Sequence, residues 1–361
     1  SIWWSLGAAF VGVMDAAIAA FKLERQEASQ AVLWLVLAAH LAYAVAVSMY
    51  FREAGLSVAL AAQLVTLAWL RHYYALSWLS LMIKAVLVIV VIRLTANPWL
   101  AAYPTDVHWS LWTYGGTFFF AAAATWLTRD LKELRRWLEA ATLHLLVLAL
   151  AAEVRYWLYD GQIFVWRFDL TEAAINTLLW TGLSLVYRYR ASVEAGLAPL
   201  YDSMSQILLL LAVASYGLAA TWLNPWWGEQ EVAVTPLINL LLLAYGLPIV
   251  LSILVARFHH PRYRKTAYSI AGGGLLLFIS LEIRHLWQGS LWLGSPTDDG
   301  ELYTYSIVWL AMAAFATLAG LRWGWHELYK AGMALLAVVI AKIFLVDMGG
   351  LEGLWRVCLL Y

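Results

Sequence analysis

Several charged side chains stand in otherwise apolar stretches of the sequence, and seven of them have the strongest claim to a chemical role. They are Lys84, Glu153, Arg155, Glu282, Arg284, Lys342 and Asp347. A charge is costly in hydrocarbon, so such residues usually face the interior of a helix bundle or a water-filled cavity. There they bind a substrate or an ion, or they pair with one another and fix the helix register. Both interpretations of this charge network stay open at the level of sequence.

Spacing and depth predict the partners within the charge network. Glu282 and Arg284 are two residues apart, so on one helix they point to nearly opposite faces and cannot pair well with each other. Each therefore needs a partner from another helix, and residues at similar distances from the outer ends of their helices can meet. The pairs predicted in this way are Glu282 with Lys342, Arg284 with Asp347, and Lys84 with Glu153.

The remaining polar residues give weaker chemical signals. His40 and His144 stand alone on apolar faces, which favours packing roles over proton transfer. His259 and His260 lie in a basic connection and are predicted to be solvated. The histidines and acids lack the spacing of metal ligands, and the chain has neither a nucleotide-binding loop nor a nucleophile motif. We therefore expect no metal and no cofactor, and the sequence assigns no catalytic residue.

Long apolar runs carry these residues. The chain has 361 residues, of which 63% are hydrophobic and 13% are charged, whereas soluble domains average about 25% charged residues. A helix of about 20 apolar residues crosses the hydrocarbon layer of a membrane, so the sequence predicts an all-α integral membrane protein with about twelve transmembrane helices. The predicted spans are residues 2–21, 29–51, 56–70, 74–96, 108–127, 137–159, 170–187, 203–223, 234–256, 267–287, 302–321 and 330–348.

Basic residues gather in alternate connections between these spans. They cluster around Arg135 and Arg262, whereas the opposite connections carry few basic residues. The positive-inside rule predicts that the basic connections face the cytoplasm. The outer connections contain the acids Asp106, Asp160, Asp169, Glu229, Glu231, Asp298 and Asp299. Because the formal net charge is zero, we expect no nucleic-acid partner.

An internal repeat relates the middle of the chain to its C-terminal third. Three markers recur 129 residues later: Glu153-Val154-Arg155 as Glu282-Ile283-Arg284, Glu172 as Glu301, and Trp180 as Trp309. Each period holds about four spans, and an even number returns the chain to the same side, which predicts parallel rather than inverted repeats. We therefore predict a single polytopic transmembrane domain over residues 1–361, with repeat units at about 29–128, 137–256 and 266–361, the last incomplete.

Two segments near the C-terminus carry a family signature. One joins residues 281–284 to 301–309, and the other runs from 330–347 into 350–357. Together they resemble a family of bacterial predicted membrane proteins catalogued as domain of unknown function 2339, with the strong match over 275–357. The resemblance implies a multi-pass protein of the bacterial cytoplasmic (inner) membrane and implies no reaction. Because that family continues beyond this signature, we expect the sequence to be part of a longer protein.

Three functions compete at this point, and whether the protein is an enzyme stays open. The first is a transporter or carrier of a small or lipidic substrate, with the charge network as its site in the outer half of the membrane. The second is a cell-envelope transferase that uses Asp106, Asp169 or Glu301 as a general base. The third is a non-catalytic scaffold subunit of an envelope complex. The expected partners are therefore the lipid bilayer, a lipid or small-molecule substrate, and an envelope-complex partner.

Overall fold

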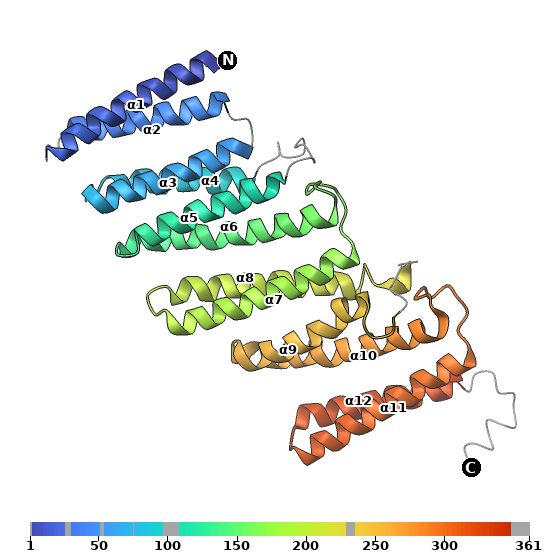
Figure 1. Cartoon of the computed structure of the whole chain (residues 1–361). Coiled ribbons are helices and arrows are strands. Elements are labelled where there is room, and N and C mark those ends of the chain that lie inside the picture. Colours follow the sequence, from blue (N-terminus) through green and yellow to red (C-terminus); the bar gives the residue numbers. More distant parts are fainter. Residues whose placement is uncertain are drawn as a thin grey trace, which may run out of the picture. The chain divides into compact units, whose positions relative to one another are not determined.

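Helical hairpins make up the described part of the chain. The computed structural model describes residues 2–25, 30–50, 54–74, 76–96, 108–228 and 235–347. Within these ranges the regular structure is helical, as predicted, and each odd-numbered α-helix packs against the helix that follows it (Figure 1). The chain divides into two compact units, Ser1–Arg167 and Phe168–Tyr361. Residues singled out in the sequence that lie outside the described ranges are Asp106, Glu229, Glu231 and the segment 350–357.

The first unit contains three hairpins and a core formed by leucines. Besides their pairing in hairpins, α3 packs against α5, and α4 packs against α6. Leu64, Leu79 and Leu138 are fully buried where these helices meet. The helices are α1 (Ile2–Glu24), α2 (Gln30–Tyr50), α3 (Ala54–Tyr74), α4 (Leu79–Thr95), the π-helical turn η2 (Leu111–Gly115), α5 (Gly116–Leu127) and α6 (Lys132–Leu158).

The second unit also contains three hairpins. α7 packs against α9, and α10 packs against α11, so the hairpins are joined through neighbouring helices. Leu170, Tyr245 and Leu281 belong to its buried core. The helices are α7 (Leu170–Val193), α8 (Ala198–Ala220), the π-helical turn η4 (Leu242–Gly246), α9 (Leu247–Phe258), the short 3-10 helix η5 (Pro261–Tyr263), α10 (Arg264–Gln288), α11 (Asp299–Arg322), α12 (His326–Lys342) and the π-helical turn η6 (Ile343–Asp347).

Seven helical segments among the described residues are long and apolar enough to cross a membrane. Large apolar side chains on them are exposed, for example Trp222 at 82% and Leu345 at 78%. Exposed apolar side chains of this kind are stable against lipid tails, whereas their contact with water costs free energy. The count of about twelve spans exceeds these seven and stays a prediction. The seven segments are Ile2–Glu24, Gln30–Met49, Lys132–Leu158, Ala198–Trp227, Pro261–Gln288, Asp299–Arg322 and His326–Asp347, beside the shorter apolar stretch Leu242–Phe258.

Two of the π-helical turns share a sequence pattern. Both η2 and η4 read Leu-x-x-Tyr-Gly, and each leads into a helix of 12 residues, α5 or α9. Tyr114 and Tyr245 in these turns are buried, and the hydroxyl of Tyr245 donates to the carbonyl of Ala219 at 2.7 Å. The two turns lie 131 residues apart, close to the spacing of the predicted repeat. The repeat units and their boundaries themselves stay predictions.

Glycines allow α11 and α12 to pack closely. A Cβ atom added at Gly332 would lie 2.5 Å from the backbone nitrogen of Thr317 on α11. A Cβ atom added at Gly320 would lie 2.5 Å from the backbone nitrogen of Tyr329 on α12. Because backbone atoms cannot give way as a side chain can, only glycine fits at these two crossings. Small residues have this role wherever membrane helices approach closely.

Replacing Gly332 with alanine is therefore expected to destabilise the protein. The added Cβ must push α11 away from α12, and overpacking of this kind costs about 1–3 kcal/mol. The matched control is Gly273→Ala in α10, where a Cβ would have open space and alanine is the better helix former by about 1 kcal/mol. Thermal unfolding in one detergent measures both variants, and equal midpoints would contradict the close packing of this hairpin.

Candidate functional site

Arg284 lies in the last turns of α10 and is buried, with 1% of its side chain exposed. Its Nη1 pairs with Oε1 of Glu301 at 3.0 Å. Its other nitrogens donate to carbonyls of the connection between α10 and α11: Leu291 at 3.2 Å, Trp292 at 2.5 Å and Ser295 at 3.0 Å. A buried guanidinium needs acceptors for its N–H groups, so these bonds hold the connection against the end of α10.

Glu301 receives the arginine in the first turn of α11, where the helix dipole favours a negative charge. Its Oε1 also accepts from the hydroxyl of Tyr305 at 3.0 Å, and its Oε2 accepts from Nε2 of Gln288 at 2.9 Å. The side chain is 0% exposed, so it is not open to a substrate as a general base. The predicted pairing of Arg284 with Asp347 is wrong, because Arg284 pairs instead with Glu301 at the start of the next helix.

Glu282 binds the segment that precedes η4. Its Oε1 accepts from Nδ2 of Asn239 at 2.9 Å, and its Oε2 accepts from the backbone N–H of Leu237 at 3.2 Å. Oδ1 of Asn239 in turn accepts from the backbone N–H of Leu241 at 2.8 Å. Leu237 has a φ of 64°, a left-handed conformation that costs about 1–2 kcal/mol for a residue with a side chain. The carboxylate therefore helps to hold a strained entry into η4 and α9.

Lys342 does not pair with Glu282, so the predicted salt bridge between them is wrong. Its Nζ lies 2.6 Å from Oδ1 of Asp347 and donates to Oγ of Ser306 at 2.7 Å and to the carbonyl of Leu302 at 2.9 Å. Asp347 follows Lys342 by five residues, and the π-helical turn η6 brings residues at this spacing to one face. Because α12 packs against α11, Lys342 reaches α11 and not α10.

Glu153 of the first unit repeats the arrangement of Glu282. Its Oε2 lies 2.8 Å from Nε2 of His108, and its Oε1 accepts from the hydroxyl of Ser110 at 2.8 Å. His108 precedes η2 by the same three positions by which Asn239 precedes η4. A glutamate near the end of one helix thus holds the residues that lead into a π-helical turn in both units.

Arg155 and Lys84 complete the charge network of the first unit. Nη2 of Arg155 donates to the carbonyl of Val165 at 2.6 Å and to that of Arg167 at 3.0 Å, in the connection after α6. Lys84 pairs with Glu133 at 2.5 Å, in the first turn of α6. The predicted pairing of Lys84 with Glu153 is wrong, because Glu153 lies 20 residues beyond Glu133, about 30 Å along the same helix.

The charge network therefore clamps helix ends and connections. None of its seven residues lines the pocket among α7, α8, α9 and α10 or the pocket among α1, α2 and α3. Asp169, another acid considered as a general base, caps α7, and its Oδ1 accepts from the backbone N–H of Glu172 at 3.0 Å. A substrate role for the network stays a prediction, and the geometry favours its structural role.

His259 and His260 are not solvated, contrary to the prediction. His259 is 6% exposed, and its Nε2 lies 2.8 Å from Oγ of Ser205 on α8 and 3.3 Å from Oγ of Ser184 on α7. Its Nδ1 accepts from the backbone N–H of His260 at 2.9 Å. His260 is half-buried and lies 2.7 Å from Oδ1 of Asp202. The ends of α7 and α8 cover these rings, which sequence alone does not reveal.

The surroundings of His259 keep its ring neutral. Burial, followed by the positive charges of His260 and Arg188, lowers the pKa of His259 to about 4. Because Nδ1 accepts a hydrogen bond, the proton of the neutral ring belongs on Nε2, which faces the two serine hydroxyls. A catalytic Ser–His pair needs an unprotonated nitrogen facing the hydroxyl. The cluster therefore joins α7 and α8 to the connection before α10 and is not a nucleophile.

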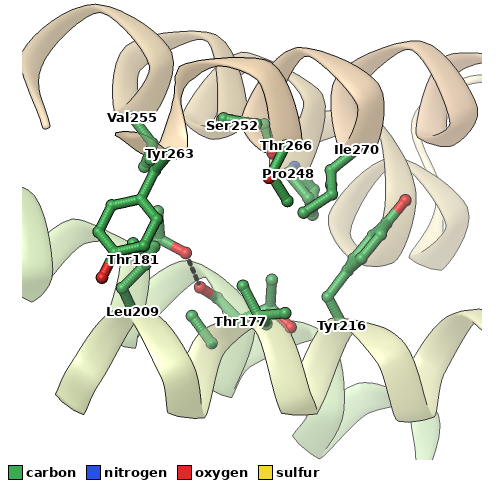
Figure 2. A pocket seen from close by; sticks show the side chains of 13 residues that line it. Thr177, Thr181, Leu209, Tyr216, Pro248, Ser252, Val255, Tyr263, Thr266 and Ile270 are labelled. Atoms are coloured by element: carbon green, nitrogen blue, oxygen red, sulfur yellow. Dashed lines mark hydrogen bonds between the residues drawn. The ribbon is translucent and has the colours of Figure 1, made fainter. Parts of the chain in front are cut away.

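A pocket of about 70 Å³ lies among α7, α8, α9 and α10, and we call it the α7–α10 pocket. Tyr263 and Tyr216 stand at its two ends (Figure 2). The hydroxyls of Thr177 and Thr181 donate to carbonyls of their own helix at 2.7 Å and 2.6 Å, so their oxygens can still accept a hydrogen bond. The wall is otherwise largely apolar; its lining residues include Leu209, Ala212, Val213, Pro248, Ser252, Val255, Thr266, Ala267 and Ile270.

A second pocket, of about 230 Å³, lies among α1, α2 and α3. His40 on its wall has Nδ1 2.9 Å from the carbonyl of Val36 and Nε2 3.3 Å from Oγ1 of Thr66. His144 elsewhere in this unit lies 2.9 Å from Oγ1 of Thr95. Both rings have the hydrogen-bond partners that their predicted packing roles require.

Replacing Arg284 with glutamine is expected to lower the free energy of unfolding by about 3–5 kcal/mol, because Glu301 would stay buried without its partner. The matched control is Lys265→Gln, which breaks an exposed pair with Glu327 at 3.4 Å and is expected to cost at most about 1 kcal/mol. Thermal midpoints in detergent compare the two variants. Similar shifts would show that the buried pair is no more important than the exposed one.

The lowered pKa of His259 predicts that stability falls in acid. The unfolded chain binds a proton near pH 6.5, whereas the folded chain resists it until about pH 4. The contribution of His259 to the free energy of unfolding is therefore fully present above about pH 6.5. It is lost as the pH falls toward 4, by up to about 3 kcal/mol. Thermal midpoints across this range should depend less on pH in His259→Gln. His326→Gln, at an exposed histidine, should behave like the wild type, and the idea fails if both variants do.

Comparison with known proteins identifies the chain at the level of family. The model of a family described as a predicted membrane protein family, DUF2339, matches residues 1–360. The match extends far beyond the C-terminal portion on which the resemblance rested, and it agrees with an apolar, helical chain. No curated protein and no solved structure matches the chain. With nearly its whole length covered by the family model, the chain belongs to the DUF2339 family of predicted membrane proteins.

Proposed function

We propose that this protein is a multi-pass membrane protein that binds a lipidic ligand, with a segment of one acyl chain held in the α7–α10 pocket. The observation that carries the proposal is the pocket itself, a largely apolar opening between helices of one unit. This function keeps the carrier of a lipidic substrate that the sequence suggested. It moves the binding site from the charge network to the space between two helical hairpins.

The shape of the pocket supports an acyl chain. The residues that α8 contributes, Leu209, Ala212, Val213 and Tyr216, follow the spacing of one helix face. The end of η5 and the start of α10 contribute Tyr263, Thr266, Ala267 and Ile270 at the same spacing. Each set covers two turns, or about 10 Å along its helix, so the pocket is elongated along the helices as a lipid tail would be.

The exposure of its margin supports entry from the membrane. Val213 is 43% exposed and Thr266 is also exposed, while Ala212, which also lines the pocket, is buried. Exposed side chains on a membrane-spanning helix face lipid, so the pocket opens toward the acyl-chain region. Pockets with mostly apolar walls and a few polar groups are the usual form of small-molecule sites.

The charge network supports the proposal indirectly. Its carboxylates and cations are held by partners within the protein, as the Arg284–Glu301 pair illustrates at 3.0 Å with both side chains buried. A substrate that displaced such a partner would leave a charge uncompensated, at a cost of several kcal/mol. A site whose groups are already neutral avoids this cost.

We also propose the finer topology for the whole chain: about twelve spans, parallel repeats, and a bacterial cytoplasmic membrane with the basic connections inside. Twelve α-helices in six hairpins among the described residues support the span count. The shared environments of Glu153 and Glu282 support the repeat. The clusters around Arg135 and Arg262 support the orientation.

Filling the pocket is expected to weaken lipid binding. Ala212→Leu adds apolar volume inside the pocket, whereas Ala214→Leu adds the same volume on an exposed face of α8. We expect the affinity for dioleoyl phosphatidylcholine, measured by native mass spectrometry, to fall about tenfold in the first variant, equivalent to losing about two buried methylene groups. The second variant should bind as the wild type does.

A second variant tests the same prediction in case Ala212→Leu does not fold. Val213→Trp places bulk at the exposed margin of the pocket, where the fold has room for it. It should reduce lipid binding to a similar extent with an unchanged thermal midpoint. Wild-type affinity in both pocket variants, each shown to be folded, would overturn the proposed function.

A further inference from the structure

Basic residues are the sequence neighbours of Tyr263 and Thr266, which line the α7–α10 pocket. Arg262 precedes Tyr263, and Arg264 and Lys265 begin α10 immediately before Thr266. These three basic side chains are exposed next to lining residues in the sequence, and the residues that line the pocket carry no charge. An apolar channel that ends beside cations matches the chemistry of an amphiphile with an anionic head.

The positive charge at this end is incompletely compensated within the described residues. Arg262 bonds only neutral groups there: its Nη2 donates to Oε1 of Gln206 at 2.5 Å and to the hydroxyl of Tyr263 at 2.7 Å. Arg264 is exposed and has no carboxylate partner in the described part of the chain. Lys265 pairs with Glu327 at 3.4 Å, but both side chains are largely exposed and the pair is weak.

The helix geometry makes this surplus charge unfavourable without an anion. Arg264 and Lys265 lie in the first turn of α10, and that turn has no acidic residue. The helix dipole is positive at this end, so basic side chains are disfavoured there and an anion is favoured. A nearby phosphate would compensate both the positive end of the helix dipole and the charges of the two side chains.

We propose that the ligand of the α7–α10 pocket is an anionic phospholipid whose phosphate binds Arg262 and Arg264. The inference rests on the proposed function, because the acyl chain occupies the pocket described above. Arg262 is held ready for this contact: its guanidinium lies 4.6 Å from the centre of the Tyr263 ring, and both of its hydrogen bonds use Nη2. Nε and Nη1 remain to donate to phosphate oxygens, which suit the planar guanidinium.

The test compares two lipids that differ only in the head group. Full-length protein in detergent is titrated with dioleoyl phosphatidylglycerol and with dioleoyl phosphatidylcholine, and native mass spectrometry gives the affinity for each. Arg262→Gln/Arg264→Gln should lose about 30-fold in affinity for the anionic lipid, since each basic residue near such a lipid contributes about 1 kcal/mol. Its affinity for the zwitterionic lipid should fall much less, because the choline cation already offsets the charge of that lipid's phosphate.

The control removes the same number of positive charges from another connection of the same unit. Arg322→Gln/Lys330→Gln removes two exposed basic residues around the connection between α11 and α12, neither of which lines the pocket. It should keep the wild-type preference for phosphatidylglycerol. Thermal midpoints of both double variants are measured first, so that loss of binding is read only from folded protein.

The outcomes separate this inference from the proposed function. If the wild type binds the two lipids with equal affinity and Ala212→Leu loses that binding, the preference for an anionic head group is overturned. The acyl-chain site then still stands. A preference for phosphatidylglycerol that both arginine replacements leave intact would also overturn it. Failure of the wild type to bind either lipid would overturn both proposals. A preference lost only in Arg262→Gln/Arg264→Gln supports the anionic site.

Discussion

A peptide carbonyl at the end of a membrane helix has no water within the apolar layer, and this constraint governs the second unit. The connection between α10 and α11 must turn back while its carbonyls keep hydrogen-bond partners. Arg284 supplies those partners from one buried guanidinium, and Glu301 neutralises the charge that this requires. The helix ends are thereby fixed, and α10, which borders the α7–α10 pocket, has a defined position at that end.

The same constraint explains why the pocket and the charges are separate. Polar groups that face the pocket, such as Thr177 and Thr181, satisfy their donors on their own helix and so cost little where lipid tails replace water. Ionised groups cannot do this and need partners of opposite charge or several dipoles. The clamps therefore lie at helix ends, and the neutral middle of the helices is left for an apolar ligand. In the proposed lipid site, the basic residues beside Tyr263 supply positive charge at one end of the pocket.

The sequence predicted the helical class and located the buried charges, because long apolar runs and isolated ionisable residues are local signals. It failed on their partners, which depend on helix packing. Lys342 meets Asp347 only because η6 is a π-helical turn, and an α-helix would separate residues five apart. His259 is buried by α7 and α8, which no local pattern shows. Glu301 had a signal, since it was already one of the repeat markers together with Arg284.

The parallel between Glu153 and Glu282 bears on what these carboxylates are for. Each accepts hydrogen bonds from residues that lead into a Leu-x-x-Tyr-Gly turn, although one partner is His108 and the other is Asn239. If these carboxylates bound a substrate, the residues beside them would be expected to have the same chemistry in both units, because both would contact the same ligand. A clamp needs only a donor at the right position, and both side chains provide one. The change of partner at a constant position is therefore what an architectural carboxylate permits, and it directs the search for a ligand to the neutral pocket between the helices.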